Sequence, residues 1–204
     1  MGGVTLFEYI KGIYIGLSKD YIIVENNNIG YKIFTSGSTM AKMPNVNEEV
    51  KLYLEQVVRE DFNGLYGFLT EEEREMFNLL MTINGVGRKA ALSLLSISNV
   101  NRLKLSIVTS DYNMLMKAPG IGKKIAQRII LELADKVGKT REDNSDMNLN
   151  NQEFNDSINN YAEAMSALLA LGFSEKEAEG ALKTVDIKTN LEEIIKKCLK
   201  HLMN

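Results

Sequence analysis

The chain has 204 residues, of which 45% are hydrophobic and 25% charged, a composition typical of a globular protein with several modules. No apolar run is long enough to cross a membrane, and the amino terminus lacks a basic segment followed by an apolar stretch. We therefore expect a cytoplasmic protein. The single Cys198 excludes an internal disulfide, and together with the one histidine, His201, it is too little for a zinc site. We expect neither a metal nor a cofactor.

The formal net charge of −3 is distributed unevenly along the chain. Residues 1–70 carry 6 Lys+Arg and 8 Asp+Glu, residues 71–137 carry 10 and 7, and residues 138–204 carry 8 and 12. Only the middle segment is basic, and its excess of positive charge is small. Binding to phosphates would therefore be weak unless several copies act together, so we expect an oligomer.

Residues 7–68 contain short runs of apolar and β-branched residues separated by turn signals. This pattern is typical of a small antiparallel barrel or sandwich. Residues 1–6 add nothing to it. The expected strands and turns are strands at 9–15, 21–25, 30–34, 50–58 and 65–68, with turns at 26–28 and 36–38.

A helical region follows the strands. Thr70 and Glu73 have the spacing of a capping box, and apolar residues at helical intervals follow them. Helical segments then alternate with short turns to about Val137. The polar composition of residues 138–153 is typical of a flexible linker.

The carboxyl-terminal part, residues 154–204, fits three short helices that form a docking module. The capping signals predict helix starts at 174–177 and at 189–192. We expect Leu168, Leu171 and Phe173 to form part of the core of this bundle.

One short phrase occurs twice, at 83–91 and 118–126, so that the copies lie 35 residues apart. Each copy places an apolar residue between two glycines, continues with two cations and then enters a helical pattern. Glycine allows a sharp turn with positive φ. The first amides of the following helix have no intrahelical partner and attract an anion. One such turn is more often a plain helix connection, but two in register predict a grip on both backbones of a duplex.

A charged turn, Glu60-Asp61, lies within residues 57–68, which we interpret as a hairpin. Taken alone, such a pair is most often a solvated turn. Adjacent carboxylates also do not make an acid/base pair without a groove and a third partner.

The charged hairpin, the doubled glycine turns, the polar linker and the Leu-Gly-Phe bundle, in this order, resemble the RuvA family, the Holliday-junction-binding subunits of the bacterial branch-migration complex. The resemblance covers nearly the whole chain from Phe7 onward. It implies an α+β multidomain protein. The implied domains are an OB-fold barrel at 1–69, a tandem helix-hairpin-helix domain at 70–137, the linker at 138–153, and a three-helix, UBA-like bundle at 154–204 that docks on the RuvB ATPase through residues not yet assigned.

The resemblance also implies a homotetramer, alone or as two stacked tetramers, that holds a four-way junction open during recombination and DNA repair. Glu60 and Asp61 match the acidic pins of the family, with Arg59 beside them. The RuvC resolvase is a further possible partner. Arg88 stands where a proline is common in relatives. The implied phosphate-binding residues are Gly85, Val86, Gly87, Arg88 and Lys89 in the first turn, and Gly120, Ile121, Gly122, Lys123, Lys124 and Arg128 in the second.

No Gly-x-x-x-x-Gly-Lys-[Ser/Thr] stretch occurs, so we expect a non-catalytic subunit whose partner hydrolyses ATP. Two alternatives stay open. A helix-hairpin-helix repair enzyme such as a glycosylase would need a catalytic carboxylate after the hairpin, for which Asp135 is the nearest candidate, and a base-flipping pocket. In a protein scaffold that does not bind DNA, every glycine turn would be structural.

Overall fold

The computed structural model of the chain describes residues 6–60, 62–138, 149–187 and 189–203. The chain divides into two compact units. One holds residues 1–103 and 115–125, and the other holds residues 104–114 and 126–204.

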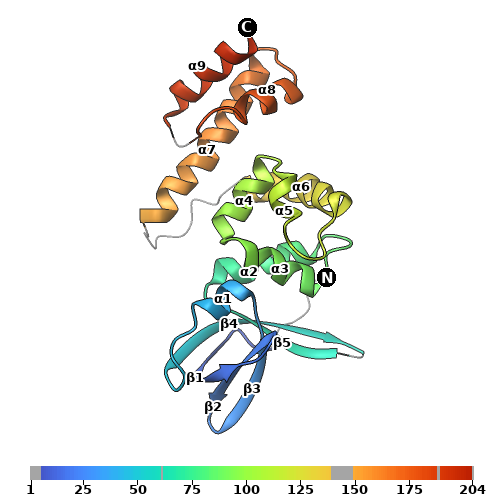
Figure 1. The fold of residues 1–204 in the computed structure, drawn as a ribbon, viewed down its shortest axis with the longest axis vertical. Coiled ribbons are helices and arrows are strands. Elements are labelled where there is room, and N and C mark those ends of the chain that lie inside the picture. The colour runs from blue at the N-terminus through green and yellow to red at the C-terminus, as the bar shows by residue number, and fades with distance from the viewer. Residues whose placement is uncertain (1–5, 61, 139–148, 188, 204) are drawn as a thin grey trace. The chain divides into compact units, whose positions relative to one another are not determined.

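Five strands in the first unit close into a barrel, as Figure 1 shows. Their order around the barrel is β1-β2-β3-β5-β4, with β4 pairing back onto β1. Only the β3–β5 pair is parallel. This arrangement is that of an OB-fold, which confirms the expected fold. The strands, each longer than expected by one or more residues, are β1 Tyr9–Leu17, β2 Tyr21–Asn26, β3 Ile29–Phe34, β4 Glu49–Arg59 and β5 Phe62–Phe68.

The barrel is filled by alternate residues of its strands, as the two-residue period of a strand requires. Ile22, Ile33 and Leu52 are fully buried there. The turn between β2 and β3 consists of Asn27 and Asn28, both with positive φ (49° and 62°). Asparagine tolerates this conformation, so the three-asparagine signal marks a tight hairpin, as expected.

Residues 36–38 begin a short helix, α1 (Gly37–Ala41), where the sequence predicts only a turn. The Ser36 side chain caps this helix by accepting a hydrogen bond from the Thr39 amide, as serine commonly does at a helix start. The Gly37 amide in turn donates to Ser96 Oγ over 2.7 Å, which links α1 to a later helix of the same unit.

The predicted start of the helical region is confirmed. Thr70 accepts a hydrogen bond from the Glu73 amide over 3.2 Å. The Glu73 carboxylate accepts from the Leu69 amide over 3.1 Å, one residue before the position that a capping box uses. None of the helices in the described part of the chain combines the length and apolar character needed to cross a membrane. The helices here are α2 Glu71–Met81, α3 Arg88–Ile97, α4 Val100–Val108, α5 Tyr112–Leu115 and α6 Lys123–Gly138.

The carboxyl-terminal part contains three helices, as expected, but the first is long. α7 runs from Leu149 to Ala170, so residues 149–153 of the expected linker are helical; residues 139–148 lie outside the described part of the chain. α8 (Glu175–Leu182) begins with a complete capping box between Ser174 and Glu177. α9 (Leu191–Leu202) is capped by Asn190, whose side chain accepts from the Glu193 amide, so its start lies one residue later than predicted.

The core of this bundle is only partly the one expected. Leu168 is fully buried and Phe173 packs against the core. Leu171, in contrast, is 60% exposed. The reason is that α7 ends at Ala170 and the chain turns at Gly172, whose φ is +95°, so Leu171 no longer follows the buried face of the helix. Cys198 is buried, and burial raises the pKa of its thiol.

Candidate nucleic-acid interface

The two glycine turns are built by the same backbone hydrogen bonds. One turn connects α2 to α3 and the other connects α5 to α6. The bonds are Ile83 N to Leu80 O (3.1 Å) and Val86 N to Ile83 O (3.0 Å) in the first turn, and Ala118 N to Leu115 O (3.1 Å) and Ile121 N to Ala118 O (3.0 Å) in the second. Every donor and acceptor is matched by one 35 residues away, so the sequence repeat is also a structural repeat.

An apolar side chain anchors each turn. Val86 and Ile121, the residues between the paired glycines, are each only 5% exposed, as predicted. Leu80 and Leu115, whose carbonyls accept the first hydrogen bond of each turn, are fully buried. Because burying a branched apolar side chain is worth about 1.5–3 kcal/mol, these residues fix the turns firmly.

The first glycine of each turn needs a conformation that other residues avoid. Gly85 has φ +95° and Gly120 has φ +88°. A Cβ added at Gly85 would lie 3.7 Å from Cγ1 of Ile125, and one added at Gly120 would lie 3.7 Å from Cβ of Ala90. Ala90 and Ile125 occupy the same position in the two copies. The two turns therefore pack reciprocally, each against the helix start that follows the other.

The second glycine of each turn leaves open space instead. A Cβ added at Gly87 or Gly122 would meet no atom within 4 Å. Gly87 is the N-cap of α3 with φ −90° and ψ 173°, a conformation open to any residue. The glycines here are thus not required by the backbone. Without a side chain at these two positions, nothing is added beside the first amides of α3 and α6, and amides at a helix start can bind oxyanions.

The cations that follow the turns differ in their surroundings. Lys89, Lys123 and Lys124 are exposed. Arg128 is exposed further along α6 and lies 3.9 Å from Glu132, one helical turn away. Arg88, in contrast, is half-buried, with its guanidinium 3.9 Å from the centre of the Phe62 ring.

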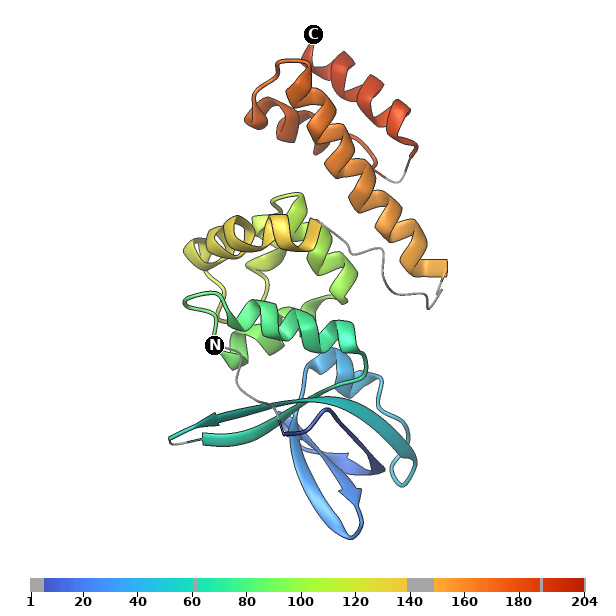
Figure 2. The ribbon, with the colours of Figure 1, turned by 180° about the vertical axis from the view of Figure 1, so that it is seen from behind.

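The β4–β5 hairpin carries the acidic turn. Arg59 and Phe62 are the last residues that pair across it. The hairpin projects beyond the barrel in both views of the ribbon (Figure 1 and Figure 2). Glu60 and Arg59 are exposed at its end, and Asp61 lies outside the described residues.

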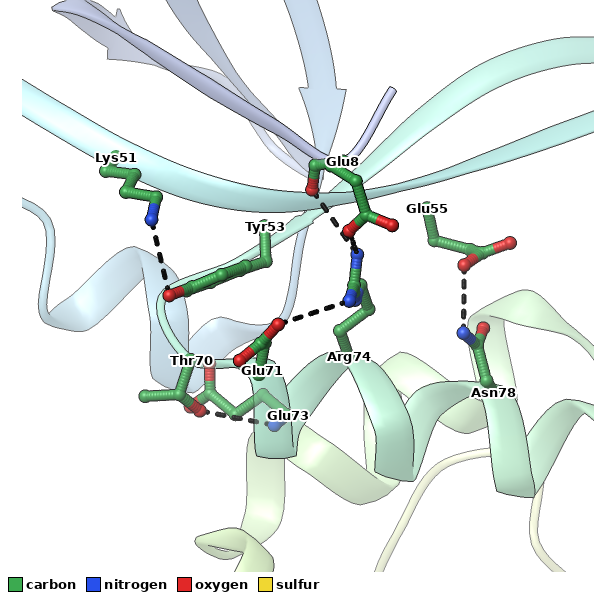
Figure 3. A network of polar contacts seen from close by, with 9 residues as sticks. All are labelled: Glu8, Lys51, Tyr53, Glu55, Thr70, Glu71, Glu73, Arg74 and Asn78. Carbon is green, nitrogen blue, oxygen red and sulfur yellow. Dashed lines mark hydrogen bonds and ion pairs between the residues drawn. The ribbon is translucent and has the colours of Figure 1, made fainter. Parts of the chain in front are cut away.

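A group of polar contacts joins α2 to the barrel, as Figure 3 shows. The Arg74 guanidinium pairs with the carboxylate of Glu8 and, over 3.5 Å, with Glu71. It also lies 5.8 Å from the centre of the Tyr53 ring on β4. The Arg74 side chain is only 16% exposed, so α2 is held against the strand by a largely buried cation.

A second contact repeats this attachment further along both elements. The Asn78 amide donates to the Glu55 carboxylate over 2.8 Å. Two residues of a strand advance about 6.6 Å, and four residues of a helix advance about 6 Å. The pairs Tyr53–Arg74 and Glu55–Asn78 therefore stay in register, with both elements running in the same direction. β4 continues to the acidic turn, and α2 continues to the first glycine turn.

Sequence reasoning located the glycine turns and the acidic hairpin but missed the residues that connect them. Phe62, Arg74 and Asn78 give little local signal, because their partners lie on other elements. One hint was available, since a polar Asn78 four residues after Arg74 shares a face of the helix with it.

Family models match three parts of the chain. They are described as RuvA N terminal domain (residues 7–67), SAM-like Helix-hairpin-helix tandem (residues 77–135) and RuvA, C-terminal domain (residues 159–203).

Curated relatives match over nearly the full chain, and each carries the name Holliday junction branch migration complex subunit RuvA. The protein from Clostridium tetani is 57% identical over 202 residues, which are 97% of this chain and 100% of the relative. That from Clostridium acetobutylicum is 57% identical over 201 residues, which are 98% of this chain and 100% of the relative. The family models match the barrel, the tandem hairpins and the terminal helices, and the relatives match nearly the full chain. This chain therefore belongs to the RuvA family.

Proposed function

We propose that this chain is the subunit of a branch-migration complex that binds four-way DNA junctions as a homotetramer and recruits the RuvB ATPase. The single observation that carries the proposal is the reciprocal pair of glycine turns. The two turns have the same pattern of backbone hydrogen bonds, and each has open space at the glycine before the following helix. Their bearing on function is strengthened by relatives named as Holliday junction branch migration complex subunits.

The proposed phosphate ligands are backbone amides assisted by cations. Lys89, Lys123 and Lys124 are exposed beside the open helix starts, and Arg128 is exposed on α6. Amide and lysine contacts to phosphate hold the backbone without reading bases, so the DNA can slide regardless of sequence. The residues proposed to form the two backbone cradles are Gly85, Val86, Gly87, Gly120, Ile121 and Gly122.

The proposed role of the β4–β5 hairpin is to separate strands. In a tetramer, four copies of Glu60 and Asp61 would form a negative ring at the crossover, where they repel phosphates and guide the separated strands outward. The surrounding cations would hold the arms. The carboxylates would act by charge and not as a nuclease.

Gel-shift competition at moderate salt tests the main proposal. Unlabelled junction should displace labelled junction at a much lower concentration than linear duplex of the same length. Equal competition by the two DNAs would refute junction recognition.

The remaining parts of the proposal have separate tests. Mass measurement of the protein, free and with junction DNA, should give a tetramer or two tetramers, and a monomer in both states contradicts it. The purified chain should hydrolyse no ATP alone, since its sequence lacks a phosphate-binding loop of the Walker type. We also propose a cytoplasmic location, the domain division at 69, 137 and 153, and RuvC as a later partner.

A further inference from the structure

Arg88 is placed differently from every other cation near the glycine turns. It is the first residue of α3, directly after the first turn. Its guanidinium lies 3.9 Å from the centre of the Phe62 ring, a distance at which a cation is attracted to an aromatic face. Its Nη1 atom is buried and has no hydrogen-bond partner among the described residues. Lys123, which occupies the same position in the second copy, is exposed.

Phe62 belongs to the hairpin that carries the acidic turn. It is the first residue of β5 and pairs with Arg59 across the end of the hairpin. Its ring centre lies 6.1 Å from that of Phe34 and 6.4 Å from that of Tyr66. Arg88 therefore connects the first glycine turn directly to the end of the hairpin that carries the acidic turn.

A second path connects the same two elements. Tyr66, on the same strand as Phe62, stacks on Phe77 of α2, with ring centres 5.1 Å apart and ring planes 24° apart. α2 leads directly into the first turn. Burial raises the pKa of Tyr66, while the positive charge of the nearby Arg88 acts in the opposite direction. The turn and the hairpin are thus joined on both sides of the turn.

A guanidinium held in this way is poorly suited to bind DNA. To reach a phosphate, Arg88 would have to leave the Phe62 ring and expose the aromatic surface that it covers. Lys89, one residue later, is exposed without such a constraint.

We propose that Arg88 is a positioning residue that clamps the first glycine turn to the acidic hairpin through Phe62, and that it is not itself a phosphate ligand. The inference rests on the proposed function, because it gives the clamp a role at the junction. The acidic end of the hairpin and the first phosphate cradle then move as one body, which fixes the spacing between crossover and arm.

The test uses the full chain with three single variants, Arg88→Gln, Phe62→Leu and Lys89→Gln, and with the double variant of Arg88 and Phe62. Affinity for a four-way junction and for linear duplex is measured at several salt concentrations. Phe62→Leu leaves the charge unchanged, and Lys89→Gln is the matched control for a lost phosphate contact.

The clamp predicts that Arg88→Gln and Phe62→Leu each lower the preference for junction over duplex by about three- to tenfold. The double variant should lose no more than either single variant, because both remove the same contact. The salt dependence of junction affinity should be the same in Arg88→Gln and in Phe62→Leu as in the parent protein. For Lys89→Gln, the slope of log K against log salt should become shallower by about one. A similar shallower slope for Arg88→Gln, or an unchanged preference in Phe62→Leu, overturns the proposal.

Amide hydrogen exchange of the free protein separates this proposal from the proposed function. Arg88→Gln should speed exchange in β5 and in the first turn but not in the second turn, whether or not the protein prefers junctions. Unchanged exchange in both elements overturns the clamp. Loss of junction preference in the parent protein refutes the proposed function alone.

Discussion

The two glycine turns share one backbone design but are surrounded differently. Their hydrogen bonds have the same lengths, 3.1 and 3.0 Å in each turn, and the anchoring residues Val86 and Ile121 are equally buried. In the first turn, however, one of the two cations, Arg88, stacks on an aromatic ring, whereas both cations of the second turn, Lys123 and Lys124, are exposed. The backbone of such a repeat can therefore be kept while the surroundings of its side-chain charges differ.

The largest expected effect comes from reversing the charges of the second turn. Lys123→Glu with Lys124→Glu should weaken junction binding by about 60-fold or more at 0.1 M salt. A slope of about −0.9 per phosphate contact corresponds to about eightfold per contact relative to 1 M salt. The matched change in the first turn, Arg88→Glu with Lys89→Glu, should make the slope shallower by about one contact instead of two. Salt titrations of both variants measure the difference, and equal slopes would remove the proposed asymmetry.

Changes to the backbone should affect junction binding equally in the two turns. Gly87→Ala and Gly122→Ala each add a methyl group to open space at a helix start. Such a group should hinder a phosphate from reaching the amides, and losing one hydrogen bond to a charged group costs about 1.5–3 kcal/mol. We expect about a tenfold or larger loss of junction affinity for each variant, with unchanged thermal stability. A loss confined to one of the two variants would show that only one turn binds phosphate.

The first glycines should show the opposite behaviour, a loss of stability. Gly85→Ala and Gly120→Ala place a Cβ at φ +95° and +88°, with neighbours at ordinary contact distance. The strain of a left-handed residue is about 1–2 kcal/mol. Urea unfolding should show this destabilisation in both variants, while Gly87→Ala in the same assay serves as the control. A variant at Gly85 as stable as the parent would mean that the turn relaxes.

The sequence was sufficient for features whose signal is local. The strands alternate buried and exposed residues, and the doubled glycine phrase marks its own turns, so both could be predicted. The five-residue helix α1 was missed because Ser36, Gly37 and Ser38 also fit a turn. The exposure of Leu171 was missed because it depends on α7 ending at Ala170, one residue before Leu171.

Contacts between distant residues could not be predicted in this way. Phe62 and Arg88 lie on different elements, and a cation above an aromatic ring leaves no periodic trace in either segment. The same holds for the contact between Arg74 and Tyr53. The candidate site was therefore predictable as a set of turns and charges, but not as a set of connected parts.

The smallest expected effect concerns the attachment of α2 to the barrel. α2 precedes the first turn in the chain, whereas Arg88 follows it. Arg74→Gln removes a cation that pairs with Glu8 and Glu71 and faces Tyr53. Exposed partners weaken such pairs, so we expect a loss of about 0.5–1 kcal/mol. For a chain of this size, that loss corresponds to a decrease in Tm of about 1–4 °C.

Lys11→Gln is the matched control for Arg74→Gln, because Lys11 pairs with Glu49 over 2.9 Å while both side chains are more than half exposed. Hydration and salt already screen that pair, so its removal should leave the Tm unchanged. A decrease in Tm that is equal in the two variants would mean that burial of Arg74 adds nothing. A decrease confined to Arg74→Gln, still present at 0.5 M salt, would show that packing of the guanidinium against β4 stabilises the helix that carries the first turn.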